Sequence, residues 1–181
     1  MEERFKEFED LLVPDSRSRY REVGPGSLEG FYRVMAGIRL NETVPQDIRN
    51  HFVTARHLVV YSWFVYPFVM LAQSHAYGTL EYALRVRLGR AADERPPTLR
   101  PLWDMAVKRG LLCDEGFRDW PGRYLAAPGA KPSTEWVRRI SESLGGLRND
   151  LAHGSFSLYP EHWRLLPMVA DAINQLYPEA S

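Results

Sequence analysis

The feature that most constrains the fold is an uncharged run of fifteen residues, Leu58 to Ala72, with the sequence LVVYSWFVYPFVMLA. A helix that spans a membrane needs about 20 apolar residues, so this run is too short. Pro67 interrupts it, and polar residues resume at Gln73. We therefore expect a helix buried at the centre of a soluble helical protein, with a kink or break near Pro67 and no membrane association.

The rest of the chain shows the apolar spacing of helices, and it has no alternating run bounded by hairpin turns. We expect helices over residues 1–13, 28–40, 43–88 (broken near Pro67), 99–109, 114–119, 133–153 and 160–177, with loops at 15–26 and around 120–132. Thr43 and Gln46 match a capping box with Pro45 in the first turn. Ser133 or Thr134 can cap the helix that follows it. The sequence thus predicts an all-α fold, a bundle of about five to seven helices.

Composition narrows the class of partner and cofactor. The 181 residues fit one compact unit. Lys+Arg and Asp+Glu both count 23, so no global field attracts nucleic acid, and RNA would have to be held by a local cluster. The single cysteine, Cys113, excludes an internal disulfide and a thiolate zinc site. The N-terminus, MEERFKEF, lacks the apolar region of a signal peptide. We expect a cytoplasmic protein without a metal or other cofactor.

Residues 143–155, with the sequence SLGGLRNDLAHGS, carry the polar residues of greatest interest. At about 100° per residue, the apolar positions of this helix fall within about 80° of each other and predict one buried stripe. These positions are Trp136, Ile140, Leu144, Leu147 and Leu151. Arg148 falls at the edge of the stripe and His153 lies about 140° away from it. For the two to act together, the helix must unwind before His153 or a second copy must complete the site.

Gly145 and Gly146 leave two interpretations open. Two glycines within a helix cost roughly 2 kcal/mol relative to alanine, which is understandable where another backbone packs very close. They can also be a tolerated weak spot or a kink. The polar residues have plain interpretations too: Arg148 can extend over neighbouring leucines, His153 can interact with the helix dipole, and Asp150 can be a solvated surface charge.

The run LRNDLAHG resembles the R-N-x-x-A-H-G form of the motif of HEPN domains (higher eukaryotes and prokaryotes nucleotide-binding). In that family Arg and His are separated by four to six residues, and here Arg148 and His153 are separated by four. The stretch TLEYALRVRL, residues 79–88, also looks like the family helix that carries an acidic residue before a basic and apolar run. The layout of residues 44–181 is similar to a HEPN domain, and residues 1–43 form an N-terminal helical extension and loop.

The resemblance implies an all-α domain that dimerises, with the Arg/His motifs of two chains in one cleft. Many such domains are metal-independent endoribonucleases of toxin–antitoxin, abortive-infection and antiviral systems, so RNA and an antitoxin or defence protein are expected partners. It implies that His153 transfers protons to and from the ribose and leaving oxygens, and that Arg148 holds the scissile phosphate. Asn149 orients the histidine or contacts the phosphate, and Asp150 is a supporting candidate.

Glu81 also has two interpretations. With Arg85 one turn later, it forms an ordinary helix-stabilising pair. As the acidic residue of the similar family helix, it would instead position Arg148 and support the site.

Two observations, the zero net charge and the residue that follows the histidine, keep an alternative function open. HEPN toxins that are paired with a nucleotidyltransferase antitoxin commonly carry a tyrosine two residues after the histidine, and here that position is Ser155. The alternative is a non-catalytic HEPN-type module that binds a protein partner, nucleotide or RNA, or else a helical domain of unrelated function. His51 and His57 lie on different faces of a helix, so we expect no metal pair, and we expect His75 to be packed or hydrogen-bonded.

Overall fold

The computed structural model describes residues 4–20, 26–90, 97–119, 131–152 and 164–179, except for the side chains of residues 19–20 and 145–152. Its α-helices are α1 (Leu28–Gly37), α2 (Gln46–Tyr61), α3 (Phe68–Leu88), α4 (Leu99–Lys108), α5 (Glu135–Ala152) and α6 (Leu165–Leu176). Three short 3-10 turns are η1 (Phe8–Asp10), η2 (Ser16–Tyr20) and η3 (Asp114–Gly116). The described residues contain no strand, so the predicted all-α bundle of five to seven helices is confirmed.

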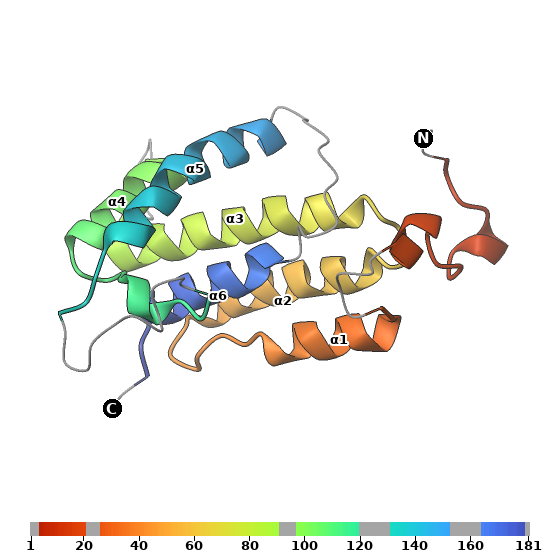
Figure 1. The fold of residues 1–181 in the computed structure, drawn as a ribbon, viewed down its shortest axis with the longest axis horizontal. Coiled ribbons are helices and arrows are strands. Elements are labelled where there is room, and N and C mark those ends of the chain that lie inside the picture. Colours follow the sequence, from red (N-terminus) through yellow and green to blue (C-terminus); the bar gives the residue numbers. More distant parts are fainter. Residues whose placement is uncertain (1–3, 21–25, 91–96, 120–130, 153–163, 180–181) are drawn as a thin grey trace.

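Helix α3 is the central helix of the bundle, because α2, α4, α5 and α6 all contact it. Figure 1 shows α4 and α5 on one side of α3 and the α1–α2 pair and α6 on the other. Leu80 and Leu84 of α3 are fully buried in one core that also contains Trp103 of α4 and Val169 of α6. Phe31 of α1 is 1% exposed in that same core, so α1 packs with the rest of the chain.

The uncharged run folds as its proline predicts. Helix α2 ends at Tyr61, and Pro67 immediately precedes α3 as its N-cap residue. A proline at a helix start loses no hydrogen bond, because the first N–H groups of a helix have no partner within the helix. The predicted break is therefore confirmed. None of the helices in the part of the chain described here has the length and apolar content to cross a membrane.

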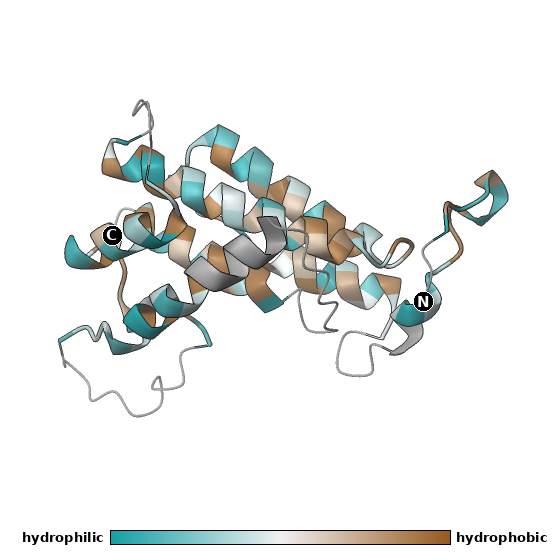
Figure 2. Ribbon diagram, turned by 90° about the horizontal axis from the view of Figure 1, so that it is seen from above, coloured by the Kyte–Doolittle hydropathy of each residue, from teal (hydrophilic) through white to brown (hydrophobic). Residues whose placement is uncertain are grey.

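The predicted helix over residues 1–13 is wrong. Only the short turn η1 forms there, and Phe5 and Phe8 are 99% and 82% exposed. This segment projects from the end of the bundle near the turn between α2 and α3 (Figures 1 and 2). A helix of a dozen residues is marginal in water unless its apolar face is buried, and no described residue covers these side chains.

The predicted loop at residues 15–26 includes the turn η2, which is attached to the bundle. Asp15 N–H and Ser18 Oγ both donate to the carbonyl of Trp63, each at 2.9 Å. Burial alone would raise the pKa of Asp15, but hydrogen bonds and charge from Arg17 hold it down to about 2. This carboxylate also accepts the N–H of Tyr66 at 3.3 Å and so fixes the segment against the turn between α2 and α3.

The predicted cap of α2 is wrong, whereas the predicted cap of α5 is observed in a weak form. Thr43 does not cap α2: its hydroxyl donates to the carbonyl of Tyr177 at 2.6 Å, and the N-cap residue Pro45 offers no side-chain bond. At the start of α5, Ser133 accepts a bond of 3.4 Å from Glu135 N–H. The shorter bonds come from Asp114, which is distant in the sequence. Tertiary contacts therefore decide how these helix ends are satisfied.

The bounds of the remaining helices agree in part with those predicted from the sequence. The turn η3 covers only the first three residues of the predicted helix 114–119. Helix α6 ends at Leu176, as predicted, but the predicted start near Pro160 lies outside the described residues. Among the described side chains of α5, Val137, Ser141 and Leu144 are buried, while Trp136 and Ile140 are only partly buried. The buried face is rotated relative to the predicted stripe because α5 packs on α4 and α3 together.

Candidate functional site

The motif residues lie at the C-terminal end of α5. Arg148, Asn149 and Asp150 belong to its last turns, and the helix continues to Ala152. Their side chains, and the whole of His153, lie outside the described residues. The backbone stays α-helical from Arg148 to Ala152, so the helix does not unwind within this stretch. Unwinding of the helix between Arg148 and Ala152, one of the two ways to bring Arg148 and His153 together, is thus not observed.

Four contacts fix the first half of α5 and thereby set the direction of its motif end. Asp114 is 1% exposed, and its carboxylate accepts the N–H groups of Trp136 and Val137 at 3.1 and 2.9 Å. The indole N–H of Trp103 on α4 donates to the carbonyl of Val137 at 2.9 Å. One turn further on, Ser141 Oγ donates to Asp104 Oδ1 at 2.6 Å. The first half of α5 is therefore anchored to α4 and to η3.

Glu81 ties α3 to the start of α4. Its side chain is buried, and Oε2 accepts the N–H of Leu99, the first residue of α4, at 3.1 Å. Its Oε1 pairs with Arg85, so the predicted helix-stabilising pair is confirmed. A carboxylate at a helix N-terminus also interacts favourably with the helix dipole. That Glu81 positions Arg148 as well stays a prediction, since the side chain of Arg148 is not among those described.

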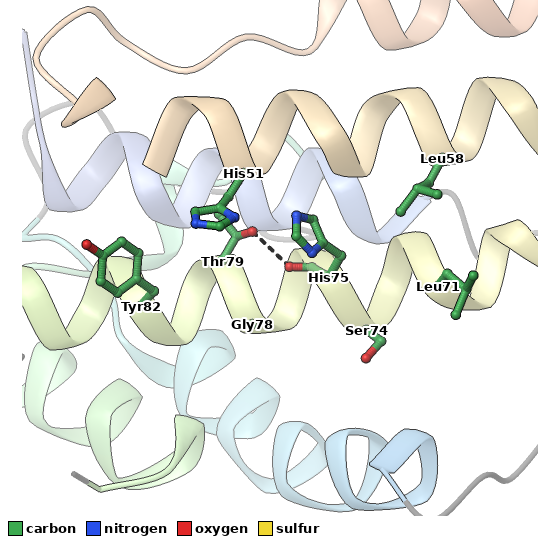
Figure 3. A pocket seen from close by; sticks show the side chains of 8 residues that line it. All are labelled: His51, Leu58, Leu71, Ser74, His75, Gly78, Thr79 and Tyr82. Carbon is green, nitrogen blue, oxygen red and sulfur yellow. Dashed lines mark hydrogen bonds between the residues drawn. The ribbon is translucent and has the colours of Figure 1, made fainter. Parts of the chain in front are cut away.

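A pocket of about 500 Å³ opens between α2 and α3, away from the motif helix (Figure 3). It is lined by His51, Leu58, Leu71, Ser74, His75, Gly78, Thr79 and Tyr82. The rings of His51 and His75 face each other across the two helices with their centroids 5.5 Å apart. His51 also contacts Tyr82 edge to face at 6.1 Å. The structure thus brings together two histidines that are 24 positions apart in the sequence.

The surroundings of His75 in this pocket disfavour its charged form. Burial, and next the neighbouring His51, lower the pKa of His75. The buried Nε2 of His75 has no well-formed hydrogen bond to any described residue. At the rim, the hydroxyl of Tyr82 donates to the carboxylate of Asp47, which lowers the pKa of Asp47 and raises that of Tyr82. No three His, Cys, Asp or Glu side chains gather for a metal ion anywhere in the described ranges.

Spacing along one helix could not reveal the pairing of His51 with His75. His57, six residues after His51, is exposed on another face of α2 and does not line the pocket. His51 instead contacts His75, which belongs to the next helix. The sequence feature that could have indicated this contact is that the two helices flank the same proline break. His75 is packed, as predicted, but its ring nitrogen Nε2 is not hydrogen-bonded.

Comparisons with known proteins assign no function to the residues of this site. No family model matches the chain, no curated protein is similar to it, and no solved structure matches its fold.

Proposed function

We propose that this protein is a HEPN-type endoribonuclease that cleaves RNA in the cytoplasm, as part of a toxin–antitoxin or antiviral defence system. The observation that carries the proposal is the run LRNDLAHG at the C-terminal end of α5. The motif occupies the end of a firmly anchored helix in an all-helical bundle, and α6 follows it. Arg148 and His153 are the proposed catalytic residues, with Asn149 beside them and Glu81 and Asp150 in support.

The residue types suit cleavage by the RNA's own hydroxyl group. A histidine takes the proton of the ribose 2′-OH, whose oxygen attacks the adjacent phosphorus and forms the new P–O bond. The bond from phosphorus to the 5′ oxygen breaks, and that oxygen receives a proton. The products are a 2′,3′-cyclic phosphate and a 5′-hydroxyl end. An arginine stabilises the charge that develops on the phosphate, so the step requires no metal ion.

A dimer completes the proposed site. Helix α5 is regular through Ala152. If position 153 continued this helix, its side chain would point about 140° away from that of position 148, and one chain would not bring both to one phosphate. Two copies of α5 related by a two-fold axis would place the arginine of one chain near the histidine of the other. The glycines at 145 and 146 permit such an approach, because a helix without Cβ atoms there can pack closely.

The test is RNA cleavage by the purified protein and by two single variants, His153→Ala and Arg148→Ala. We expect the wild-type protein to cleave single-stranded RNA with EDTA present and to leave 2′,3′-cyclic phosphate ends. Loss of a general acid–base residue or of a phosphate-binding arginine lowers such rates by about 10²–10⁴-fold. Arg139→Ala is the matched control, because Arg139 lies on the same helix and pairs with Glu135 on the surface.

Cleavage that persists unchanged in both motif variants would contradict the proposed residues. Tight RNA binding without cleavage, unaffected by His153→Ala, would instead identify the protein as a non-catalytic binding module. The end groups separate attack by the 2′-OH from hydrolysis by water, since hydrolysis leaves no cyclic phosphate.

A further inference from the structure

A second depression lies between α4 and α5, on the helix that carries the motif. It has a volume of about 360 Å³ and collects three basic side chains. Helix α4 contributes Arg100, Asp104 and Lys108, and helix α5 contributes Arg138, Ser141 and Glu142. We call this depression the α4–α5 groove. It is separate from the motif end of α5 and from the pocket between α2 and α3.

The three cations of the groove are exposed and have no anionic partner among the described residues. Arg100 and Lys108 lie two turns apart on α4, and Arg138 faces them from α5. The only hydrogen bond that Arg138 makes from its side chain to the described part of the chain is a weak one of 3.3 Å from Nε to Thr134. Elsewhere, arginines commonly form ion pairs within the chain. Examples among the described residues are Arg17–Asp15, Arg33–Glu29, Arg85–Glu81, Arg118–Asp171 and Arg139–Glu135.

A hydrogen bond between the two helices fixes the shape of the groove. Its lining includes Ser141, which is 3% exposed and donates a hydrogen bond to the half-buried carboxylate of Asp104. That bond occupies one oxygen of Asp104, and Glu142 is the only other anionic side chain of the lining. Three cations against two carboxylates leave a positive excess in a chain whose net charge is zero. Arginine binds phosphate with two parallel N–H bonds, so a phosphate group complements the excess.

The groove points along α5 toward the motif. Position 149 comes eleven residues after Arg138, which places it about 20° around the helix and about 16 Å along its axis. The face of α5 that lines the groove therefore continues to the motif. A stacked nucleic acid strand rises by about 3.4 Å per nucleotide, so about five nucleotides cover this distance.

We propose that the α4–α5 groove binds the sugar–phosphate backbone of single-stranded RNA and leads it along α5 to Arg148 and His153. The groove should bind RNA without sequence specificity, because its cationic side chains contact phosphate groups and not base edges. The assignment rests on the proposed function for the nature of the substrate, and it adds where that substrate is held. It also explains how a protein with no net charge can bind a polyanion.

The test measures binding of a fluorescent single-stranded RNA of twenty nucleotides by anisotropy, as a function of salt. All proteins carry His153→Ala so that the RNA stays intact. Adding Arg100→Gln, Lys108→Gln or Arg138→Gln should each lower the slope of log affinity against log salt by about 0.7, and weaken binding at 0.1 M salt about fivefold. The triple variant should bind about 100-fold more weakly. A duplex DNA probe distinguishes a preference for RNA from binding of any polyanion.

Arg139→Gln is the control, because it removes the same charge from the neighbouring residue, which is paired with Glu135. It should change affinity less than twofold. Thermal unfolding of each variant should match that of the parent, since the three cations are exposed. The proposal is overturned if the groove variants bind RNA as the parent does, if Arg139→Gln weakens binding equally, or if the groove prefers an acidic peptide to RNA.

The outcomes also separate this inference from the proposed function. If wild-type protein cleaves RNA in a His153-dependent way but the groove variants bind normally, the groove assignment fails alone. If the groove variants lose RNA binding while wild-type protein shows no cleavage, the groove assignment stands and the catalytic proposal fails.

Discussion

The carboxylate of Asp114 decides where α5 begins. It lies 22 residues before Trp136 in the sequence, is almost completely buried, and accepts two of the N–H groups that have no partner within the helix. Its chain neighbour Glu115 adds a bond from Ser133 N–H at 2.8 Å. The motif at the far end of α5 therefore depends on an acidic residue in a different segment.

Replacing Asp114 should loosen the start of α5. Asp114→Ala leaves two backbone N–H groups buried without a partner, and we expect the free energy of unfolding to fall by about 1–2 kcal/mol. Asp114→Asn keeps an acceptor oxygen and should recover part of that loss. Chemical denaturation measures the change, and Asp119→Ala at an exposed position should alter stability by less than about 0.5 kcal/mol. Equal effects of Asp114→Ala and Asp119→Ala would refute this role.

The pairing of His51 with His75 predicts a loss of stability in acid. The pKa of His75 is lowered in the folded chain by burial and by His51, whereas the unfolded chain titrates near 6.5. The unfolded state then binds more protons below pH 6.5, so stability is full above that pH and declines as the pH falls through the folded pKa. His75→Gln should flatten the decline that begins below about pH 6.5. His57→Gln, outside the pocket, should leave it unchanged.

At the scale of the element, the sequence predicts helices well where the signal is local. The helix expected over 28–40 is observed as Leu28–Gly37, that over 99–109 as Leu99–Lys108, and the break falls at Pro67. Apolar periodicity and the missing N–H of proline act within a few residues, so they can be recognised in one sequence. The helix over residues 1–13 fails because its stability would require a surface to pack against, which periodicity does not supply.

The candidate site was predictable only in part, for the same reason. The spacing of Arg148 and His153, and the pair of Glu81 with Arg85, are local features of single helices. The contact of Glu81 with Leu99, the facing rings of His51 and His75, and the α4–α5 groove all depend on how helices dock. No spacing rule places Arg100 opposite Arg138.

The glycines at positions 145 and 146 of α5 can be tested for a role in the packing of two chains. In the double variant Gly145→Ala/Gly146→Ala we expect weaker self-association and slower RNA cleavage, because the added methyl groups hold two helices apart. Each alanine should also favour the helix by about 1 kcal/mol. Sedimentation equilibrium measures the association and thermal unfolding measures the stability. A more stable protein with unchanged association would show that the glycines are only a tolerated weak spot.

At the scale of the whole molecule, charge is balanced globally but not locally. The chain has 23 basic and 23 acidic side chains, and many arginines are neutralised by a carboxylate one turn or one contact away. Within the described residues, the α4–α5 groove places three cations beside two carboxylates and is one local positive site. In the proposed function, recognition of a polyanion would depend on such a local excess of charge and not on the balanced total.

The proposed two-chain cleft can be tested by mixing two inactive proteins. In a dimer of two Arg148→Ala chains neither chain has the catalytic arginine, and in a dimer of two His153→Ala chains neither has the catalytic histidine. Each homodimer should therefore be inactive. A mixed dimer contains one arginine and one histidine on different chains, and these meet only if the cleft is shared. Equal co-expression makes about half of the dimers mixed, and each mixed dimer holds one of the two Arg/His pairs of a wild-type dimer, so cleavage should return to at most about a quarter of the wild-type rate. Two variants that dimerise with each other but restore no cleavage would show that each chain acts alone.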